Sequence, residues 1–181
     1  MKKFNNKENE CITKENIGDR EIWNSRSVAV VGVIVTKMKN DYFVLINKRG
    51  VGAADNNGKY NLCCGYLDWG ETGYDAIIRE VFEESGVDLN DIKMNHNIIY
   101  DFTNQPFFVN TSTKENRQNV SLSYGLIFET NVLPKTTNIF SELEEVEEIL
   151  WCNIENLDGY DFAFEHNDRI KSFMDSFFNQ D

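Results

Sequence analysis

Residues 65–87 read GYLDWGETGYDAIIREVFEESGV. This stretch is a loop that turns into a short, strongly acidic helix. Thr72 is a good N-cap, Asp75 follows three residues later as in a capping box, and Gly86 can take the left-handed position that ends a helix. We therefore predict a helix of about three turns between Thr72 and Gly86.

The predicted helix separates acidic from apolar side chains. At 100° per residue, Glu80, Glu83 and Glu84 fall within an arc of roughly 100°. The opposite side collects the apolar residues, which are Tyr74, Ile77, Ile78, Val81 and Phe82. One interpretation is an amphipathic surface helix whose acids face water. The other is a cation site, because like charges three and four residues apart repel each other and a bound cation would relieve that repulsion.

The residue types at this spacing favour a particular kind of ion. Glutamate oxygens are hard ligands, which suit Mg²⁺ or Mn²⁺ better than zinc. Such an ion could polarise a phosphoryl oxygen or activate a water molecule. The whole chain has only two histidines, His96 and His166, which disfavours a zinc site or a histidine-based triad.

Composition limits what the chain can bind. With 181 residues, of which 41% are hydrophobic, it is long enough for one domain with a substantial core. Its formal net charge of −12 disfavours nucleic acids and anionic membranes, because no basic field attracts phosphates over a distance. A phosphate-bearing substrate would therefore need metal ions as its positive partner.

Two features predict a cytoplasmic protein with reduced thiols. Residues 1–23 contain no apolar stretch like that of a signal peptide, and the longest aliphatic run, 28–35, is too short to span a bilayer. The four cysteines form no C-x-x-C pair and are too scattered for a disulfide framework. We interpret Cys63 and Cys64 as loop packing rather than as a redox or metal pair.

The rest of the chain alternates strands and loops before a final helix. Residues 1–24 are predicted to be a flexible or partner-docked arm, and residues 25–179 to form the domain. Hydrophobic patterns predict strands within 27–37, 41–48, 94–102, 119–132 and 148–153, the first two as a hairpin, and a closing amphipathic helix at 168–178. Loops are expected at 49–59, 103–117 and 133–145. This order predicts an α/β layered domain.

The stretch 65–87 resembles the Nudix box, with no departure from that family's pattern. The matching residues are Gly65, Glu71, Arg79, Glu80, Val81, Glu83, Glu84, Gly86 and Val87. The resemblance implies the Nudix fold, a mixed β-sheet sandwiched between α-helices. Outside the box it is softer, because 61–65 (NLCCG) takes the place of the frequent Leu-Pro-Gly-Gly lead-in and both the Pro and the first Gly are replaced by Cys.

The resemblance also implies an activity. It is hydrolysis of a nucleoside diphosphate linked to another moiety, as in an NDP-sugar, a dinucleotide or a nucleoside triphosphate, by attack of water on phosphorus. Carried over by position, Glu83, Glu84 and the Gly65 carbonyl would bind Mg²⁺ or Mn²⁺, with more than one ion per site. Glu80 would be a further ligand or the base that activates water.

Arg79 and Glu71 complete the predicted catalytic unit as an ion pair that holds the loop on the helix. Many relatives add a carboxylate from a later loop, and the candidates here are Glu142, Glu144, Glu145, Glu147 and Glu148. Each of these also fits a solvated acidic loop. Arg26 and Arg49 are candidate phosphate contacts, which fit structural roles equally well. Tyr60, Phe107 and Phe108 are candidates for stacking on a base, although aromatic residues more often belong to a core.

Other functions stay open at this stage. A Nudix-like module could bind a nucleotide or sugar nucleotide as a sensor without turnover, but such modules usually lose box carboxylates and this chain keeps all of them. Isomerisation of a prenyl diphosphate needs a Cys and His pairing that the sequence does not place. Residues 104–107 (NQPF) faintly resemble a motif of the NADH-cleaving branch, without its later positions. The expected partner is a small nucleoside diphosphate derivative, and a homodimer is compatible with the resemblance.

Overall fold

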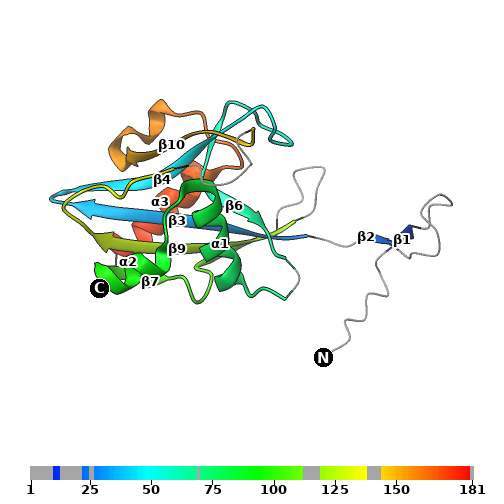
Figure 1. Ribbon diagram of the computed structural model, residues 1–181, viewed down its shortest axis with the longest axis horizontal. Coiled ribbons are helices and arrows are strands. Elements are labelled where there is room, and N and C mark those ends of the chain that lie inside the picture. The colour runs from blue at the N-terminus through cyan, green and yellow to red at the C-terminus, as the bar shows by residue number, and fades with distance from the viewer. Residues whose placement is uncertain are drawn as a thin grey trace.

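The computed structural model describes residues 10–12, 22–24, 27–68, 70–111, 119–137 and 144–179. Most of them form a mixed β-sheet with helices on both faces (Figure 1), which confirms the predicted fold class. Within the predicted arm, two short strands, β1 (Glu10–Ile12) and β2 (Ile22–Asn24), pair antiparallel. Arg26 and Glu142 lie outside the described residues, so the roles predicted for them stay predictions.

Two long strands form the centre of the sheet. β3 (Val28–Met38) runs parallel to β9 (Val120–Glu129), and it forms the predicted antiparallel hairpin with β4 (Asp41–Arg49). The apolar residues of β3 form a continuous run rather than an alternation, because both faces of the sheet are covered and successive side chains point to opposite faces.

The outer strands are antiparallel additions to this centre. The order across the sheet is β10-β4-β3-β9-β7, with β7 (Asn97–Phe102) and β10 (Val146–Asn153) at its ends. Three short strands extend it, namely β5 (Tyr60–Asn61) on β4, β6 (Cys63–Tyr66) on β3 and β8 (Phe108–Asn110) on β9. The sequence predicts none of these three, since each is too short to show a periodic pattern.

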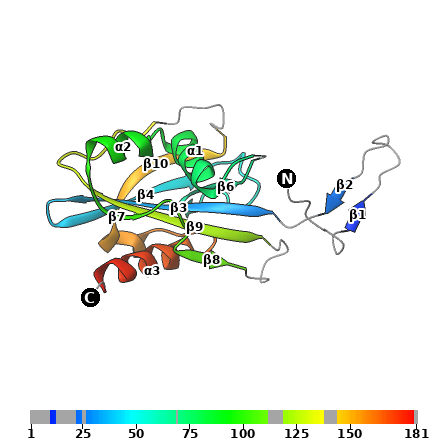
Figure 2. The same cartoon turned by 90° about the horizontal axis from the view of Figure 1, so that it is seen from below.

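The helices lie on both faces of the sheet. α1 (Gly73–Ser85) and α2 (Leu89–Asn95) cover one face, and α3 (His166–Phe178) covers the other (Figure 2). A short 3₁₀-helix, η1 (Ile154–Gly159), follows β10. None of the helices in the described part of the chain is long and apolar enough to cross a membrane.

The prediction of a strand over 94–102 is wrong at its start, where α2 ends at Asn95. Asp88 accepts hydrogen bonds from the backbone N–H groups of Asn90 and Asp91, which caps this helix. Leu89 and Ile92 of α2 are buried in the core. The cap and these two contacts therefore favour a helical turn before the chain enters β7.

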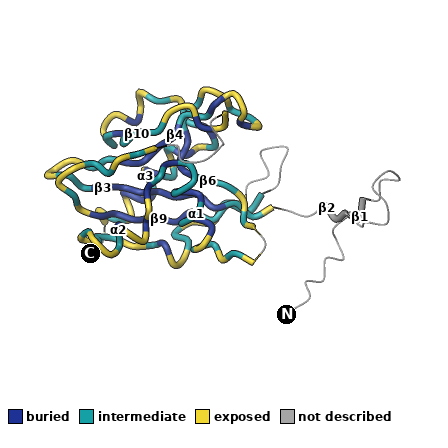
Figure 3. The backbone as a smooth tube through the Cα atoms, in the orientation of Figure 1, coloured by how far each residue is buried: buried dark blue, intermediate teal, exposed yellow. Residues whose placement is uncertain are grey.

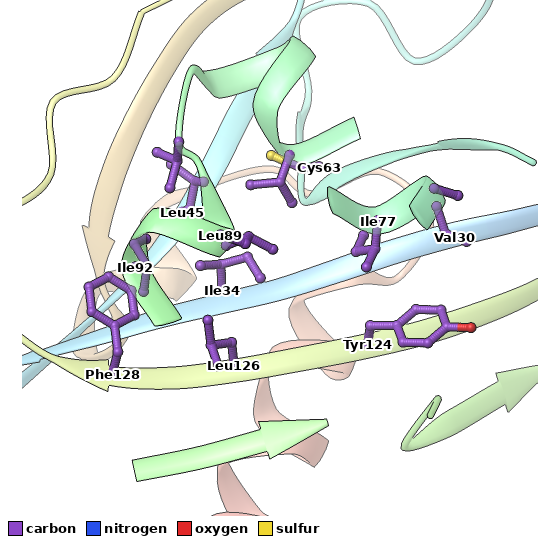
Figure 4. Packing of buried hydrophobic residues seen from close by; sticks show 13 residues of the cluster. Val30, Ile34, Leu45, Cys63, Ile77, Leu89, Ile92, Tyr124, Leu126 and Phe128 are labelled. Carbon is purple, nitrogen blue, oxygen red and sulfur yellow. The ribbon is translucent and has the colours of Figure 1, made fainter. Parts of the chain in front are cut away.

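The core occupies both faces of the sheet and runs along β3 and β9 (Figure 3). On the α1 face, the fully buried side chains of Ile34, Ile77 and Leu126 belong to one hydrophobic cluster between α1, β3 and β9 (Figure 4). On the α3 face, Phe173 packs so closely on Gly125 that a Cβ atom there would overlap its ring. Full burial of one such side chain stabilises the fold by about 1.5–3 kcal/mol. This packing holds α1 at a fixed position over the sheet.

Candidate active site

The predicted capping residues fix both ends of α1. The Thr72 hydroxyl accepts from the Asp75 backbone N–H, and the Asp75 carboxylate accepts from the Thr72 backbone N–H, so the capping box is complete. Gly86 ends the helix with φ of 72°, and its N–H donates to the Phe82 carbonyl. The predicted helix and its boundaries are confirmed.

Glu80 lies closer to the sheet than a simple helical wheel indicates. The buried residues of α1 are Ala76, Ile77, Glu80, Val81 and Ser85. Because Glu80 follows Ala76 by four residues, it continues the stripe that faces the sheet, and it is 9% exposed. The expectation that Glu80 shares an arc with Glu83 and Glu84 opposite the core is corrected in this respect. A Cβ atom at Gly65 would overlap the Glu80 carboxylate, so the absent side chain makes room for it.

Arg79 joins the loop, the helix and two glutamates. Its Nε and Nη2 atoms lie 2.6 and 3.0 Å from the two carboxylate oxygens of Glu71. Its Nη1 donates to Glu80 Oε1 at 2.7 Å and to Glu83 Oε2 at 2.9 Å. Nη2 also donates to the Tyr66 carbonyl at 3.0 Å. Glu71, followed by Glu83 and Glu80, raises the pKa of Arg79, so the guanidinium stays charged.

The ion pair expected between Arg79 and Glu71 is present, and it ties the loop to the helix. Glu71 Oε2 accepts from the Asp68 backbone N–H at 3.0 Å while the carboxylate is held by Arg79. The hydrogen bonds from Arg79 lower the pKa of Glu71, so it is ionised at neutral pH. Paired planar geometry of this kind adds direction as well as attraction. Glu71 therefore connects the loop that begins at Asp68 to Arg79 on the helix.

Glu84 has a different set of partners. Its Oε2 accepts from Asn47 Nδ2 at 2.6 Å and from the Cys64 backbone N–H at 3.2 Å. Burial raises the pKa of Glu84 well above its usual value, and the negative charge of Glu80 adds to this effect. Asn47 is 1% exposed on β4 and was not predicted as a site residue. An amide directly after the apolar run of this strand is the signal that could have found it.

The donor chemistry fits a hard divalent cation. In the part of the chain that the structure describes, no three His, Cys, Asp or Glu side chains converge closely enough to bind one metal ion as they stand. Glu80 and Glu83 already meet at one positive centre, the Arg79 guanidinium. Glu84 is near enough for the charge of Glu80 to raise its pKa. The available donors are all carboxylate oxygens, which Mg²⁺ and Mn²⁺ prefer.

The two cysteines beside the site are protonated thiols. Burial raises the pKa of Cys63 well above its usual value and that of Cys64 to about 12, with the charge of Glu84 as the next cause in each case. Asn61 Nδ2 donates to Cys64 Sγ at 3.4 Å. A thiol with a raised pKa is a poor nucleophile and a poor metal ligand. Packing is therefore the role that their environment supports.

His166 is a buried residue to which the sequence assigned no role. Its Nδ1 accepts from the Leu62 backbone N–H at 3.0 Å, which fixes the segment between β5 and β6. Burial, then the charges of Arg169 and Arg49, lower the pKa of His166 to about 3. The imidazole is therefore neutral at physiological pH. No local pattern could have found this contact, since 104 residues separate its partners.

Arg49 lies near the carboxylates but has partners of its own. Its Nε donates to the Asp55 carbonyl at 2.9 Å, and its Nη2 lies 3.2 Å from Asp55 Oδ1. Its guanidinium also sits 5.1 Å from the centre of the Phe164 ring. The charge of Arg49 opposes the rise in the pKa of Glu84, which shows that the two groups interact.

Both the ring and the hydroxyl of Tyr60 have partners within the protein, so the ring is not an open surface for stacking. Its hydroxyl donates to Glu148 Oε2 at 3.0 Å, and its ring packs edge-on against Tyr160 with centroids 4.8 Å apart. Burial and the bond to Glu148 raise the pKa of Tyr60 to about 12. Glu147, the neighbouring candidate, pairs with Lys48 at 2.8 Å. Glu147 and Glu148 thus have structural partners in this structure.

Glu144 and Glu145 hold the loop that follows β4. Their carbonyl oxygens accept from the backbone N–H groups of Gly52 at 2.6 Å and Gly50 at 2.7 Å. A Cβ atom at Gly50 would overlap the Glu144 carbonyl, so this close approach needs glycine. The acidic segment before β10 and the loop that begins at Arg49 are therefore fixed to each other.

The fold and the site together define an α/β/α protein with a carboxylate-bearing loop and helix. A sequence model described as the NUDIX domain matches residues 26–177, and the chain belongs to the Nudix family. No curated protein matches the sequence.

Solved structures share this fold at low sequence identity. The NUDIX domain of Shewanella oneidensis NrtR, complexed with ADP ribose, has a TM-score of 0.64 and 15% identity, with 84% of this chain and 89% of that chain covered. The Ap4A hydrolase of C. elegans has a TM-score of 0.59 and 16% identity, with 84% of this chain and 98% of that chain covered. A third similar structure is a bifunctional NMN adenylyltransferase/ADP ribose pyrophosphatase from Francisella tularensis, complexed with AMP and a Mn ion. Its TM-score is 0.60 and its identity 19%, with 84% of this chain and 42% of that chain covered. These likenesses concern the fold.

Proposed function

We propose that this protein hydrolyses the pyrophosphate linkage of a nucleoside diphosphate joined to another moiety, with Mg²⁺ or Mn²⁺ held by Glu80, Glu83 and Glu84. The observation that carries the proposal is the position of Arg79, whose Nη1 contacts both Glu80 and Glu83. Two carboxylates that meet at one positive centre, beside a third whose pKa is raised by burial and then by the charge of Glu80, form a place that stabilises cations.

The chain's own residues would supply position and proton transfer. Reactions at pyrophosphate depend on positioning and charge neutralisation more than on covalent chemistry. A bound divalent cation supplies positive charge for the phosphate oxygens and makes water more acidic. Glu80, which is buried beside Gly65, would accept a proton or act as a ligand. Arg79 and Glu71 keep the loop, with the Gly65 carbonyl as a further proposed ligand, in register with the helix.

The substrate class is proposed from the family and from the site. The names of the similar structures include ADP ribose, Ap4A and AMP with a Mn ion, which supports a small nucleotide derivative for this chain as well. Arg49, whose charge acts on Glu84, remains a candidate phosphate contact. Tyr60 is a weaker candidate for the base, because its ring and hydroxyl already have partners. A cytoplasmic location is retained as a prediction from the sequence.

The test is a substrate panel with both metals. ADP-ribose, Ap4A, NADH, UDP-glucose and nucleoside triphosphates are incubated with Mg²⁺ or Mn²⁺, and the products are separated by chromatography. We expect cleavage within the pyrophosphate of at least one compound, and loss of that cleavage in excess chelator. Binding of a compound without any product would favour the sensor alternative. Full turnover in excess chelator would remove metal dependence from the proposal.

A further inference from the structure

One half-buried cation in the described part of the chain has no carboxylate partner. Arg169 lies in the first turn of α3, and its guanidinium carbon is 3.5 Å from the centre of the Phe108 ring. Every other half-buried Lys or Arg among the described residues has a carboxylate at ion-pairing distance, and these are Lys37, Lys48, Arg49, Lys59, Arg79 and Lys93. In a chain with 30 acidic and 18 basic residues, an unpaired guanidinium of this kind needs an explanation.

Nearby acidic residues do not neutralise this group. The charges of Glu165 and Asp168 act to raise the pKa of Arg169, but burial outweighs them and lowers it. Neither residue forms an ion pair with Arg169 among those found in the described residues. A cation that has lost water without gaining an anionic partner is stabilised by an anion that reaches it.

A buried hydroxyl without a partner lies beside the same aromatic ring. Phe108 of β8 and Ser123 of β9 are directly opposite each other, so their side chains share one face of the sheet. Ser123 is 1% exposed, and within the described residues its Oγ has no hydrogen-bond partner. Most buried polar groups in proteins are paired, with protein, water or ligand. Ser123 can therefore offer one hydrogen bond to a group that enters this region.

The sheet connects this cluster with the carboxylate site. Ser123 is in register with Val31 of β3, and Val31 with Cys64 of β6. The Cys64 backbone N–H donates to Glu84. Three strand spacings thus separate the backbones of Cys64 and Phe108, which amounts to roughly 14 Å within the plane of the sheet. Because α1 and α3 cover opposite faces (Figure 2), a ligand that contacts both places also has to pass an edge of the sheet.

We propose that Arg169, Phe108 and Ser123 form a subsite for an anionic group, a phosphate or carboxylate, that the substrate carries in addition to its pyrophosphate. This inference rests on the proposed function. The guanidinium fork binds paired oxygens of phosphate or carboxylate. The Phe108 ring supports the plane of the guanidinium, and the Ser123 hydroxyl donates one more hydrogen bond.

The experiment compares ligands that differ by one anionic group. NADPH differs from NADH by a phosphate, and UDP-glucuronate differs from UDP-glucose by a carboxylate. Binding is measured by calorimetry with Ca²⁺ in place of Mg²⁺, and chromatography afterwards verifies that each ligand is intact. We expect the charged member of at least one pair to bind about tenfold more tightly to the unchanged protein. The pair that shows the preference identifies the anion as phosphate or carboxylate.

Variants assign the preference to the subsite. Arg169→Gln should remove it, whereas Lys171→Gln, which deletes an exposed charge from the same helix, should leave it intact. Arg169→Lys keeps the charge without the fork and should retain part of the preference, and it replaces Arg169→Gln if that variant does not fold. Ser123→Ala should raise the melting temperature of the free protein, because it removes an unpaired buried hydroxyl. The same change should weaken binding of the charged ligand about threefold.

Two results would overturn the inference. One is equal affinity for both members of both pairs, and the other is a preference that survives Arg169→Gln. A variant that only lowers the melting temperature, with the preference unchanged, likewise assigns Arg169 a purely structural role. An Arg169-dependent preference without hydrolysis of any compound in Mg²⁺ would support the subsite and refute the proposed hydrolysis. The two proposals therefore fail separately.

Discussion

Glu83 and Glu84 are the residues at which a metal-binding role and a purely structural role give opposite results. If they hold no metal, Gln at either position relieves like-charge repulsion of roughly 0.2–0.5 kcal/mol per pair and leaves hydrolysis intact. If they hold metal, Glu83→Gln or Glu84→Gln should leave the metal-free fold as stable as before or more so. The rate should then fall at least about a hundredfold, roughly 2.7 kcal/mol in the barrier, and most stabilisation by Mg²⁺ should be lost.

Thermal melts with and without Mg²⁺, together with initial rates, check this prediction. Glu155→Gln is the matched control, because Glu155 is an exposed glutamate in η1, outside the box. It should melt and react like the parent protein. A Glu84→Gln enzyme with normal melting and the parental rate would contradict the assignment of Glu84 as a ligand.

His166 predicts how stability depends on pH. Its pKa is lowered to about 3 in the folded protein, whereas the ordinary value is near 6.5 in an unfolded chain. As the pH falls below about 6.5, the unfolded chain gains a proton that the folded protein excludes, so the free energy of unfolding decreases by up to about 1.4 kcal/mol per pH unit. Above that pH the group is neutral in both states and contributes no slope.

His166→Gln separates this effect from the other titrating groups. Glutamine can accept from the Leu62 backbone N–H but cannot titrate, so the loss of stability between about pH 6.5 and pH 4 should be shallower in the variant. Urea denaturation at several pH values measures the slope. His96→Gln, the other histidine replacement, serves as the control. Equal slopes in His166→Gln and the parent would mean that His166 is not a buried neutral group.

At the scale of elements, the contact between α1 and β6 depends on the absence of one side chain. A methyl group at Gly65 would overlap the flexible end of Glu80, so Gly65→Ala should move the carboxylate more readily than the backbone. We expect the free energy of unfolding to change by no more than about 1 kcal/mol. Hydrolysis should fall by more than about tenfold, because a ligand or base is displaced.

A double-mutant cycle shows whether Gly65 acts through Glu80. Once Glu80→Ala has been made, adding Gly65→Ala should cost no further activity, since the overlap is gone. Gly159→Ala is the control, because a Cβ atom at Gly159 meets no other atom. Independent, additive losses from the two changes would instead assign Gly65 a role unrelated to that carboxylate.

Elements with local signals could be predicted from the sequence, and those made by long-range contacts could not. The N-cap, capping box and C-terminal glycine of α1 all lie within its own stretch, so its boundaries follow from it. β6 is a strand only because it pairs with β3, 31 to 37 positions earlier in the chain, and its own four residues carry no pattern. The sequence does not predict α2, because the apolar residues of the following strand mask the signal of its Asp88 cap.

The candidate site divides in the same way. The box supplied Glu71, Arg79 and the three helix glutamates, since their spacing is local. Asn47 is 37 residues away from its partner Glu84, and His166 is 104 residues away from its partner Leu62. Only the fold brings these residues together. The burial of Glu80 also depends on the sheet, because a helical wheel gives angles but not the direction of the core.

At the scale of the whole molecule, the N-terminal segment is predicted to be dispensable for the chemistry. None of the box residues lies in it, and it has little apolar content before Ile22. Deletion of residues 1–20 should leave the metal-dependent rate within a few-fold of the parent, as measured by initial rates. Size-exclusion chromatography of both proteins supplies the control for association. Complete loss of activity would mean that the segment builds a dimer or lines the site.

The position of Arg79 has a further consequence for how the molecule is assembled. An acidic helix that depended on an external cation would acquire its shape only after that cation arrived. Here the guanidinium, which the chain itself provides, already pairs with Glu71, Glu80 and Glu83 and offsets part of their charge. The loop and the helix are therefore held together before any metal ion binds. Any ion that binds later competes with an internal charge, so metal occupancy reports the outcome of an exchange and can be reversed without unfolding the protein.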